Sequence, residues 1–309
     1  MTAGSDRWVR TKDICLALMV VVIWGVNFVV IHVGLPGVPP LLFAALRFAV
    51  ICLVVPFVPR PQVKWRDLAA VGLLMSAGQF GFLYSALAVG LASGLASLLL
   101  QAQALFTVAV AAVVLRERPR PVQLIGLAVA VGGLVVVGAG QSGATPAVGI
   151  ALCLAAAACW GAGNVAARRC SGASGLGLTV WGSIFVPLPL LALSVLIDGP
   201  AAIGQALTHI GWPAVLSTVY TVVLASLVGY TVWNGLLGRY PAGIVAPFTL
   251  LVPVVGLLAG SLLLDEQIRL TTLVGGALLL VGVAVVVVGP RLVARRAATG
   301  RVPGVLGRT

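Results

Sequence analysis

Charged residues are scarce in this sequence: Asp, Glu, Lys and Arg make up 8% of the 309 residues, whereas 61% are hydrophobic. A soluble domain carries roughly a quarter charged residues, so these side chains cannot cover a globule of this size with polar surface. The mean hydropathy of +1.16 agrees. The composition therefore excludes a water-soluble globular protein and indicates a chain whose solvent is the lipid bilayer.

Histidine and closely spaced cysteine are also rare. The chain has 2 His and 5 Cys, without a CxxC pair, an HExxH or GxSxG motif, or a Ser-His-Asp set. Four of the cysteines fall in apolar runs, where Cys behaves as a small hydrophobe. We therefore expect no disulfide framework, no metal site, no cofactor and no enzymatic activity.

The net charge of +12 comes from short basic clusters between apolar runs. Such clusters are typical of the cytoplasmic loops of membrane proteins, which face anionic lipid headgroups. The charge therefore does not indicate nucleic-acid binding. The partners that we expect are the lipid bilayer and a small-molecule metabolite, and the sequence leaves the choice between monomer and homodimer open.

Ten apolar runs reach the length of about 20 residues that a membrane-spanning helix needs. They are continuously apolar rather than alternating, which argues against membrane strands. The predicted spans are 14–33, 41–58, 68–88, 94–115, 122–139, 148–167, 176–197, 212–236, 242–264 and 271–289. Residues 198–211 form the longest predicted loop on the outer side.

The positions of Lys and Arg predict the orientation. With a cytoplasmic N-terminus, all but two of the 19 Lys and Arg residues fall in cytoplasmic segments. The exceptions are Arg47, which lies within a span, and Arg269, in an outer loop. The positive-inside rule thus predicts a multi-pass inner-membrane protein with both termini in the cytoplasm, ending in a basic tail over residues 290–309.

The two halves of the sequence repeat one another. The run from Ile14 to Gly25 matches that from Ile150 to Gly161, and Leu115–Glu117 matches Leu264–Glu266. Each half holds five spans, so the second half would enter the membrane upside down, as in many secondary transporters. We predict an all-α membrane protein of ten transmembrane helices, arranged as two inverted five-helix repeats around a central cavity.

Several motifs resemble the paired EamA domains of the drug/metabolite transporter superfamily. They are Trp24–Phe28, Leu46–Phe48, Gly94–Leu98, Gln101–Ala104, Trp160–Asn164, Leu237–Tyr240, Val245–Pro247, Leu251–Leu257 and Leu262–Glu266. The resemblance covers nearly the whole chain and implies EamA repeats at 13–139 and 148–289. It further implies outward transport of small amino acids, of the cysteine and O-acetylserine type, across a bacterial inner membrane.

Amide side chains within the spans are the main candidates for a substrate site. Asn27 and Asn164 occupy similar positions in the first span of each half, and either bind a zwitterion or join neighbouring helices. Gln101 and Gln103 face opposite sides of their helix, so we expect only Gln103 to line the cavity, with Gln79 as its partner. An amide both donates to a carboxylate and accepts from an ammonium group.

Arg47 is the one charged residue well inside a span. A cation there costs at least about 2.5–3.5 kcal/mol on insertion scales unless it is paired or hydrated. Its counterpart in the second half is Ser183. We favour a structural role, in which Arg47 bonds to carbonyl groups or reaches the interface, over the binding of a substrate carboxylate.

Aromatic and acidic residues complete the set. Trp24 and Trp160 lie beside the two Asn residues, and Tyr230 shares a helical face with Trp233, at a depth that suits a gate. All seven acidic residues lie at or beyond the ends of the predicted spans. We interpret Glu117, Asp265 and Glu266 as helix caps or partners of Arg116, Arg118 and Arg269 rather than as proton carriers.

These features predict an exporter of small amino-acid metabolites that works by alternating access, driven mainly by the substrate gradient. The alternative is the same kind of transporter with another cargo, such as aromatic amino acids, nucleosides or sugars. A cationic drug would call for a carboxylate within the membrane, which the spans lack. A membrane-embedded enzyme is the remote alternative.

Overall fold

The computed structural model describes residues 10–141, 147–170, 172–240 and 242–299. Every regular element in these ranges is a helix. Ten of the helical segments are long and apolar enough to cross a membrane, judged by length and composition. The predicted all-α membrane fold with ten spans is therefore confirmed.

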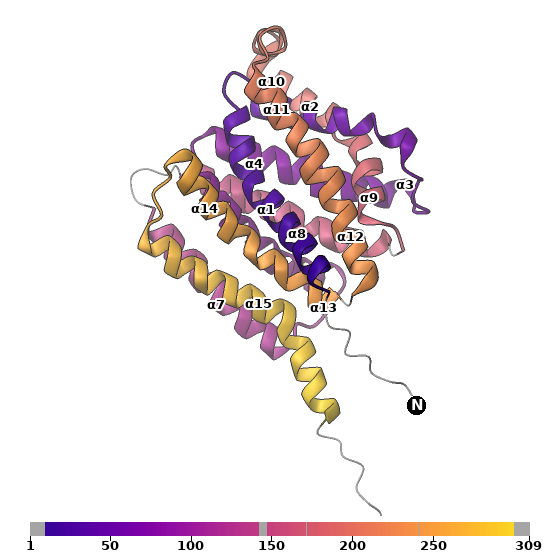
Figure 1. Ribbon diagram of the computed structural model, residues 1–309, viewed down its shortest axis with the longest axis vertical. Helices are drawn as coiled ribbons and strands as arrows, with labels where there is room; N and C mark the ends of the chain where they lie inside the picture. The colour runs from indigo at the N-terminus through magenta and orange to yellow at the C-terminus, as the bar shows by residue number, and fades with distance from the viewer. Residues whose placement is uncertain (1–9, 142–146, 171, 241, 300–309) are drawn as a thin grey trace, which may run out of the picture.

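Several spans are interrupted by short 3-10 or π-helical turns (Figure 1). The segments of the first half are α1 (Thr11–Gly34), α2 (Pro40–Cys52), η1 (Val55–Phe57), α3 (Trp65–Val71), η2 (Gly72–Gly78), α4 (Gln79–Ala88), α5 (Ser93–Leu99), η3 (Leu100–Ala102), α6 (Gln103–Val114) and α7 (Pro121–Ala139). The segments of the second half are α8 (Ala147–Ala167), η4 (Arg168–Cys170), α9 (Gly175–Gly182), η5 (Ser183–Phe185), α10 (Pro187–Thr208), α11 (Trp212–Val219), η6 (Tyr220–Val228), α12 (Gly229–Arg239), α13 (Ala242–Val245), η7 (Ala246–Leu251), α14 (Val252–Leu264) and α15 (Leu270–Thr299).

The seventh span differs from the prediction at its end. Gly199 has φ 81° and ψ 156°, which breaks α10 into two helical pieces. A glycine adopts this backbone conformation without steric cost. Residues 175–198 thus form the span, in agreement with the predicted 176–197, while the predicted loop 198–211 is helical from Pro200 to Thr208.

The bundle has two chemically different ends. The start of α1 and the end of α15 lie at the same end (Figure 1). We call this the basic end, because the loops there carry most of the Arg and Lys residues; the opposite end is the far end. The predicted basic tail begins within α15, and residues 300–309 lie outside the described part of the chain.

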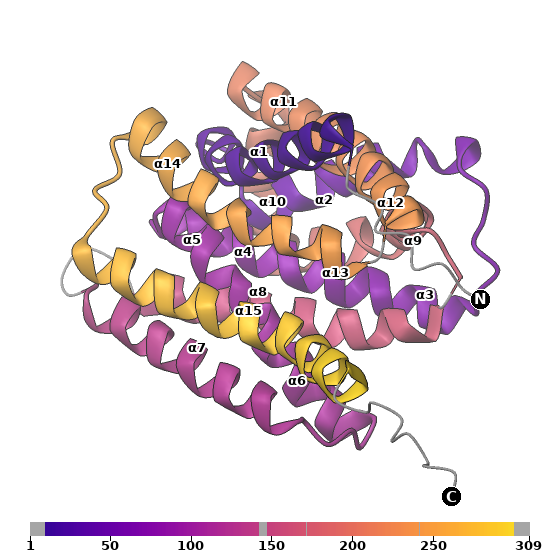
Figure 2. The same ribbon diagram turned by 60° about the horizontal axis from the view of Figure 1, so that its bottom comes forward.

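The last spans of the two halves, α7 and α15, run side by side along one flank of the molecule (Figures 1 and 2). Glycines bring the two backbones together: a Cβ on Gly133 would lie 2.5 Å from the carbonyl oxygen of Gly275. Gly126 meets Gly282 in the same way, with 2.8 Å to its carbonyl oxygen. Small residues permit this close packing where lipid supplies no hydrophobic drive.

The other spans surround the centre of the bundle. The first spans of the two halves each pack on the fourth span of the other half, α1 on α14 and α8 on α6. Gly25 makes room for Val255 in the first contact, and Gly161 for Phe106 in the second. The second and seventh spans also pack together, as α2 on α10.

The third span of each half contains a π-helical stretch, η2 in the first half and η6 in the second. A π turn adds a residue to the helical repeat and so rotates the face that the following residues present; such turns occur often at functional sites. Gln79 and Phe80 follow η2, and Tyr230 and Trp233 follow η6. All four side chains line the cavity described next.

Candidate functional site: a central cavity

A cavity of about 290 Å³ lies in the middle of the bundle. Its wall comes from spans of both halves: the first, second, third, fourth, sixth, eighth and ninth. Seven of the eight predicted site residues line it, namely Trp24, Asn27, Arg47, Gln79, Gln103, Trp160 and Tyr230. The eighth, Asn164, lies behind this wall.

The amide group of Asn164 holds Gln103 in place. Its Nδ2 donates to Gln103 Oε1 at 2.8 Å and to Thr107 Oγ1 at 3.1 Å. The Thr107 hydroxyl donates in turn to the Gln103 carbonyl oxygen at 2.7 Å. Asn164 thus fixes the side chain of Gln103 from the neighbouring helix, which leaves the Nδ-type donors of Gln103 directed away from this bond.

Asn27 is not a mirror image of Asn164. It is 8% exposed and lines the cavity, and its Oδ1 is buried without a hydrogen-bond partner. A buried acceptor without a partner carries a free-energy cost of about 1–3 kcal/mol. Asn27 therefore offers a ready acceptor to an N–H group, whereas Asn164 is already bonded.

Gln101 also lines the cavity, so the prediction that only Gln103 does is wrong. The backbone tightens into the 3-10 turn η3 at Leu100–Ala102, and the regular α-helical spacing on which the prediction rested does not hold there. The Nε2 of Gln101 donates to the Thr249 carbonyl oxygen at 3.3 Å. This bond joins the fourth span to the ninth.

Aromatic side chains form the wall toward the basic end. The ring of Trp24 lies 5.6 Å from Tyr230 and 5.4 Å from Trp233, centroid to centroid. The Trp24 Nε1 donates to the Ala225 carbonyl oxygen at 2.9 Å, which fixes the indole against η6. A cation can be attracted to the faces of such rings.

Arg47 is 3% exposed and does not reach the membrane interface, so one predicted alternative is wrong. Its guanidinium group lies 4.1 Å from the centroid of the Phe80 ring. Its Nη2 donates to Ser226 Oγ at 3.1 Å and to the Thr221 carbonyl oxygen at 3.5 Å, and its Nη1 to Tyr84 Oη at 3.4 Å. These partners are neutral, and the Arg47 Nε is buried without a partner.

A second cavity of about 200 Å³ continues from the first toward the basic end. Arg47, Met75, Phe80 and Tyr230 border both cavities. The second cavity extends to Ala167 and Gly175, which lie near the end of α8 and at the start of α9. A route therefore leads from the basic end past Arg47 to the central cavity.

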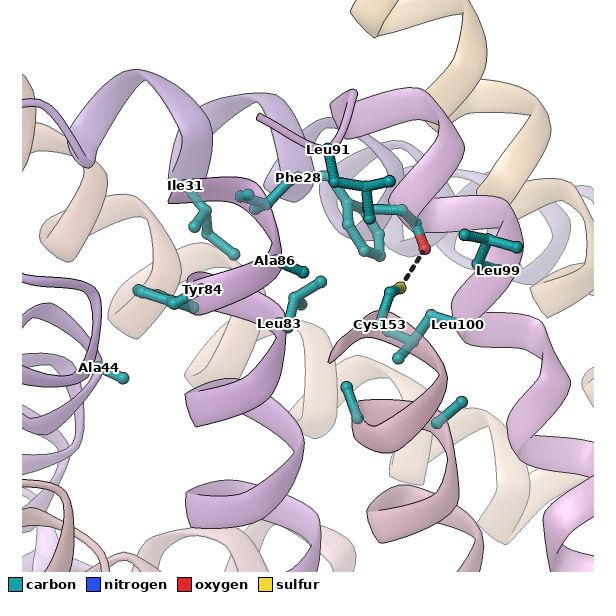
Figure 3. Close-up of a cluster of buried hydrophobic side chains, with 14 of the residues drawn as sticks. Phe28, Ile31, Ala44, Leu83, Tyr84, Ala86, Leu91, Leu99, Leu100 and Cys153 are labelled. Atoms are coloured by element: carbon teal, nitrogen blue, oxygen red, sulfur yellow. Dashed lines mark hydrogen bonds between the residues drawn. The ribbon is translucent and has the colours of Figure 1, made fainter. Parts of the chain in front are cut away.

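The far end of the central cavity is closed by packed apolar side chains. Phe28, Leu83 and Leu100, which line the cavity on this side, are 6%, 1% and 3% exposed. Figure 3 shows them with Leu91 and Cys153 in one cluster, where the Cys153 Sγ contacts the Ala96 carbonyl oxygen at 3.5 Å. The cavity is thus accessible from the basic end and sealed at the far end.

The acidic residues lie away from the central cavity. Among the cavity-lining residues that the structure describes, none is Asp or Glu. Asp13 is 4% exposed and bonds to Tyr240 Oη at 2.7 Å and Arg239 Nη1 at 2.9 Å near the basic end. Glu117 pairs with Arg168 at 2.7 Å rather than with the predicted Arg116 or Arg118.

Comparison with known proteins agrees with this architecture. The model of the EamA-like transporter family matches residues 11–139 and 147–288. A protein of Salmonella typhimurium described as a probable amino-acid metabolite efflux pump is 44% identical over 300 residues, covering 95% of this chain and 99% of that protein. A protein of Escherichia coli with the same description is 42% identical over 287 residues, covering 91% and 96%.

More distant similarities extend the comparison. A probable terminal-alkyne amino-acid exporter of Streptantibioticus cattleyicolor is 30% identical over 288 residues, covering 89% of this chain and 93% of that protein. A solved crystal structure shares the fold with a TM-score of 0.60 at 20% identity, covering 94% of this chain and 99% of the other. At that identity the likeness concerns the fold alone.

Proposed function

Because the chain belongs to the EamA-like transporter family, we propose that it exports small amino-acid metabolites across the bacterial inner membrane. The proposed cargo is of the cysteine and O-acetylserine type, and the proposed mechanism is alternating access. The efflux-pump descriptions of the relatives at 44% and 42% identity support the cargo class. The inverted pattern of helix contacts between the two halves, α1 on α14 and α8 on α6, supports rocking of one repeat against the other.

One observation carries the proposal: the central cavity combines a single cation with several amide groups and aromatic rings, and no carboxylate lines it in the described residues. Arg47 would receive the substrate carboxylate, exchanging its long bonds to neutral partners for charge-assisted ones. The free Oδ1 of Asn27 would accept from the substrate ammonium group, which the rings of Trp24 and Trp160 would also attract.

The size of the cavity suits a small cargo. Its 290 Å³ lies at the lower end of the range of about 300–1,000 Å³ for pockets that hold drug-sized ligands. The aromatic wall of Trp24, Tyr230 and Trp233 favours one second candidate, an amino acid with an aromatic side chain. That candidate would use the same Arg47 and Asn27 contacts.

The proposed orientation places the basic end and both termini in the cytoplasm, since basic loops remain on that side. The described structure then corresponds to a state open toward the cytoplasm and closed toward the outside. In this state an exporter loads its cargo. The route past Arg47, Phe80 and Tyr230 would be the loading path.

An efflux assay tests the proposal. Cells that lack other exporters would express this chain, and release of cysteine and O-acetylserine would be measured beside that of aromatic amino acids, nucleosides and sugars. Asn27→Ala and Gln103→Ala should reduce release, whereas Gln205→Ala, an exposed amide outside the cavity, should not. Release of another class alone would reject the cargo, and full release from both cavity variants would reject the site.

A further inference from the structure

The turn that follows α14 directs an acidic side chain from the second half of the chain onto the first. Asp265 ends the helix in the left-handed conformation with φ 53°. The Glu266 backbone N–H then bonds to the Gly260 carbonyl oxygen at 3.2 Å. Its carboxylate accepts from the backbone N–H of Ser93 at 2.6 Å and of Gly94 at 2.9 Å.

These two bonds cap the start of the fourth span, α5. The first N–H groups of a helix have no partner within it, and their partial positive charge favours a carboxylate. Bonds between N–H groups and a carboxylate are also among the stronger hydrogen bonds in proteins. Glu266 therefore ties α5 firmly to the end of α14, and the sequence-based expectation that it pairs with Arg269 is replaced by this contact.

The surrounding glycines leave room for the carboxylate. A Cβ on Gly260 would collide with Glu266 Oε2. A Cβ on Gly94 would lie 2.9 Å from Leu257 Cα and 3.2 Å from the same oxygen. The site is therefore shaped for this side chain on both helices.

The tie lies where the fourth and ninth spans meet. At the far end α5 packs on α14, whereas nearer the basic end the continuation of the fourth span, α6, packs on α8. The central cavity lies between the two spans, with Gln103 on one wall and Thr249 on the other. A route from the cavity to the far end must pass between α5 and α14, and Glu266 bridges them there.

The matching turn in the first half makes no such tie. Arg116 has φ 55° and the Glu117 N–H bonds to the Ala111 carbonyl oxygen at 3.4 Å, so the backbone repeats that of the second half. Ala111, however, stands where the second half has Gly260, and the Glu117 side chain is 53% exposed in its pair with Arg168. The acid locks only the far end.

We infer that Glu266 is an outer latch: its carboxylate holds the far end closed through Ser93 and Gly94, and an outward-open state forms when these bonds break. This rests on the proposed transport function. Glu266 touches no cargo in this scheme, so it is a positioning residue that sets the balance between the two open states.

The test measures access to each end with a membrane-impermeant thiol reagent and needs no cargo. Leu95→Cys places a reporter in the far-end seal, and Leu178→Cys places one in the cavity near the basic end. The chain without a reporter gives the background from its native cysteines. Labelling rates are compared for reagent added to the far face and to the basic face of oriented vesicles.

Two variants break the latch by different means. Glu266→Gln removes the charge, and Gly260→Ala displaces the carboxylate without a change in charge. Each should raise far-face labelling of the Leu95→Cys reporter roughly tenfold, in line with the loss of a charge-assisted bond, and should lower basic-face labelling of Leu178→Cys. The matched control Asp265→Asn removes the neighbouring exposed charge, keeps a residue that tolerates the left-handed conformation, and should change neither rate.

Opposite changes at the two ends would not arise from a mere loss of stability. Equal labelling rates in Glu266→Gln, Gly260→Ala and Asp265→Asn would overturn the latch. If Glu266→Gln fails to insert, Gly260→Ala carries the comparison alone. Because no cargo is involved, a negative labelling result leaves the export proposal standing, and a negative efflux result leaves the latch testable.

Discussion

Replacing Arg47 by methionine should separate transport from stability. Methionine has a similar length and fills the same space against Phe80 without the charge. The stability terms nearly cancel. The three hydrogen bonds of Arg47, at 3.1 to 3.5 Å, contribute about 0.5–1.5 kcal/mol each. The cation–π contact adds about 0.5–2 kcal/mol.

Against these contributions stands the cost of a cation inside the membrane, about 2.5–3.5 kcal/mol. The free energy of unfolding of Arg47→Met should therefore lie within about 1–2 kcal/mol of the parent value. Binding of a carboxylate loses at least one charge-assisted hydrogen bond, about 1.5–3 kcal/mol. The half-saturating cargo concentration should rise roughly 10- to 150-fold.

The assay combines uptake into proteoliposomes over a range of cargo concentrations with thermal unfolding in detergent. Arg47→Lys serves as the control, since it keeps the charge but loses the planar fork, and it should fall between parent and Arg47→Met. Unchanged half-saturation in Arg47→Met would refute a carboxylate contact. A large fall in melting temperature with unchanged transport would instead support the purely structural role that the sequence favoured.

Three further predictions concern packing, positioning and energy coupling. Gly133→Ala should lower the melting temperature in detergent, because its Cβ meets the backbone of Gly275 and α15, whereas Gly132→Ala, with open space around it, should not. Asn164→Ala should reduce transport through Gln103, so in a double-mutant cycle the Asn164→Ala and Gln103→Ala effects should be less than additive; full additivity would show that they act separately. Efflux from proteoliposomes should stay the same when the pH gradient is collapsed, since no acid lines the described cavity; strict dependence on the gradient would contradict a substrate-driven mechanism.

The ten spans could be predicted from the sequence because the bilayer imposes a simple rule. Each helix must satisfy its own backbone and present about 20 apolar residues, and both requirements are visible in the sequence. The membrane location of Asn27, Gln79 and Gln103 follows from the same rule, because polar groups in a span seek one another or a cavity. These three do line the cavity, although their binding of cargo stays a prediction.

Side-chain directions were harder to predict, because they depend on a regular helical repeat. Gln101 was placed on the wrong face, since η3 tightens the helix at that point. The break at Gly199 escaped for a related reason: Gly-Pro marks a change of direction, but helix can resume beyond it, as it does at Pro200. The sequence shows where regularity is at risk and does not show what replaces it.

The partners of charged groups depend on contacts between residues far apart in the chain, and these were the least predictable features. Glu266 was expected to pair within its own loop, yet its carboxylate reaches Ser93, which lies 173 positions earlier. One signal was nevertheless present. The two halves share the turn at Leu115–Glu117 and Leu264–Glu266 but differ in the residue that faces it, Ala111 in one half and Gly260 in the other. In an inverted repeat the two ends of the molecule are built from equivalent parts, so a substitution at one such pair is what makes one end bind more tightly than the other, and hence what sets the resting state.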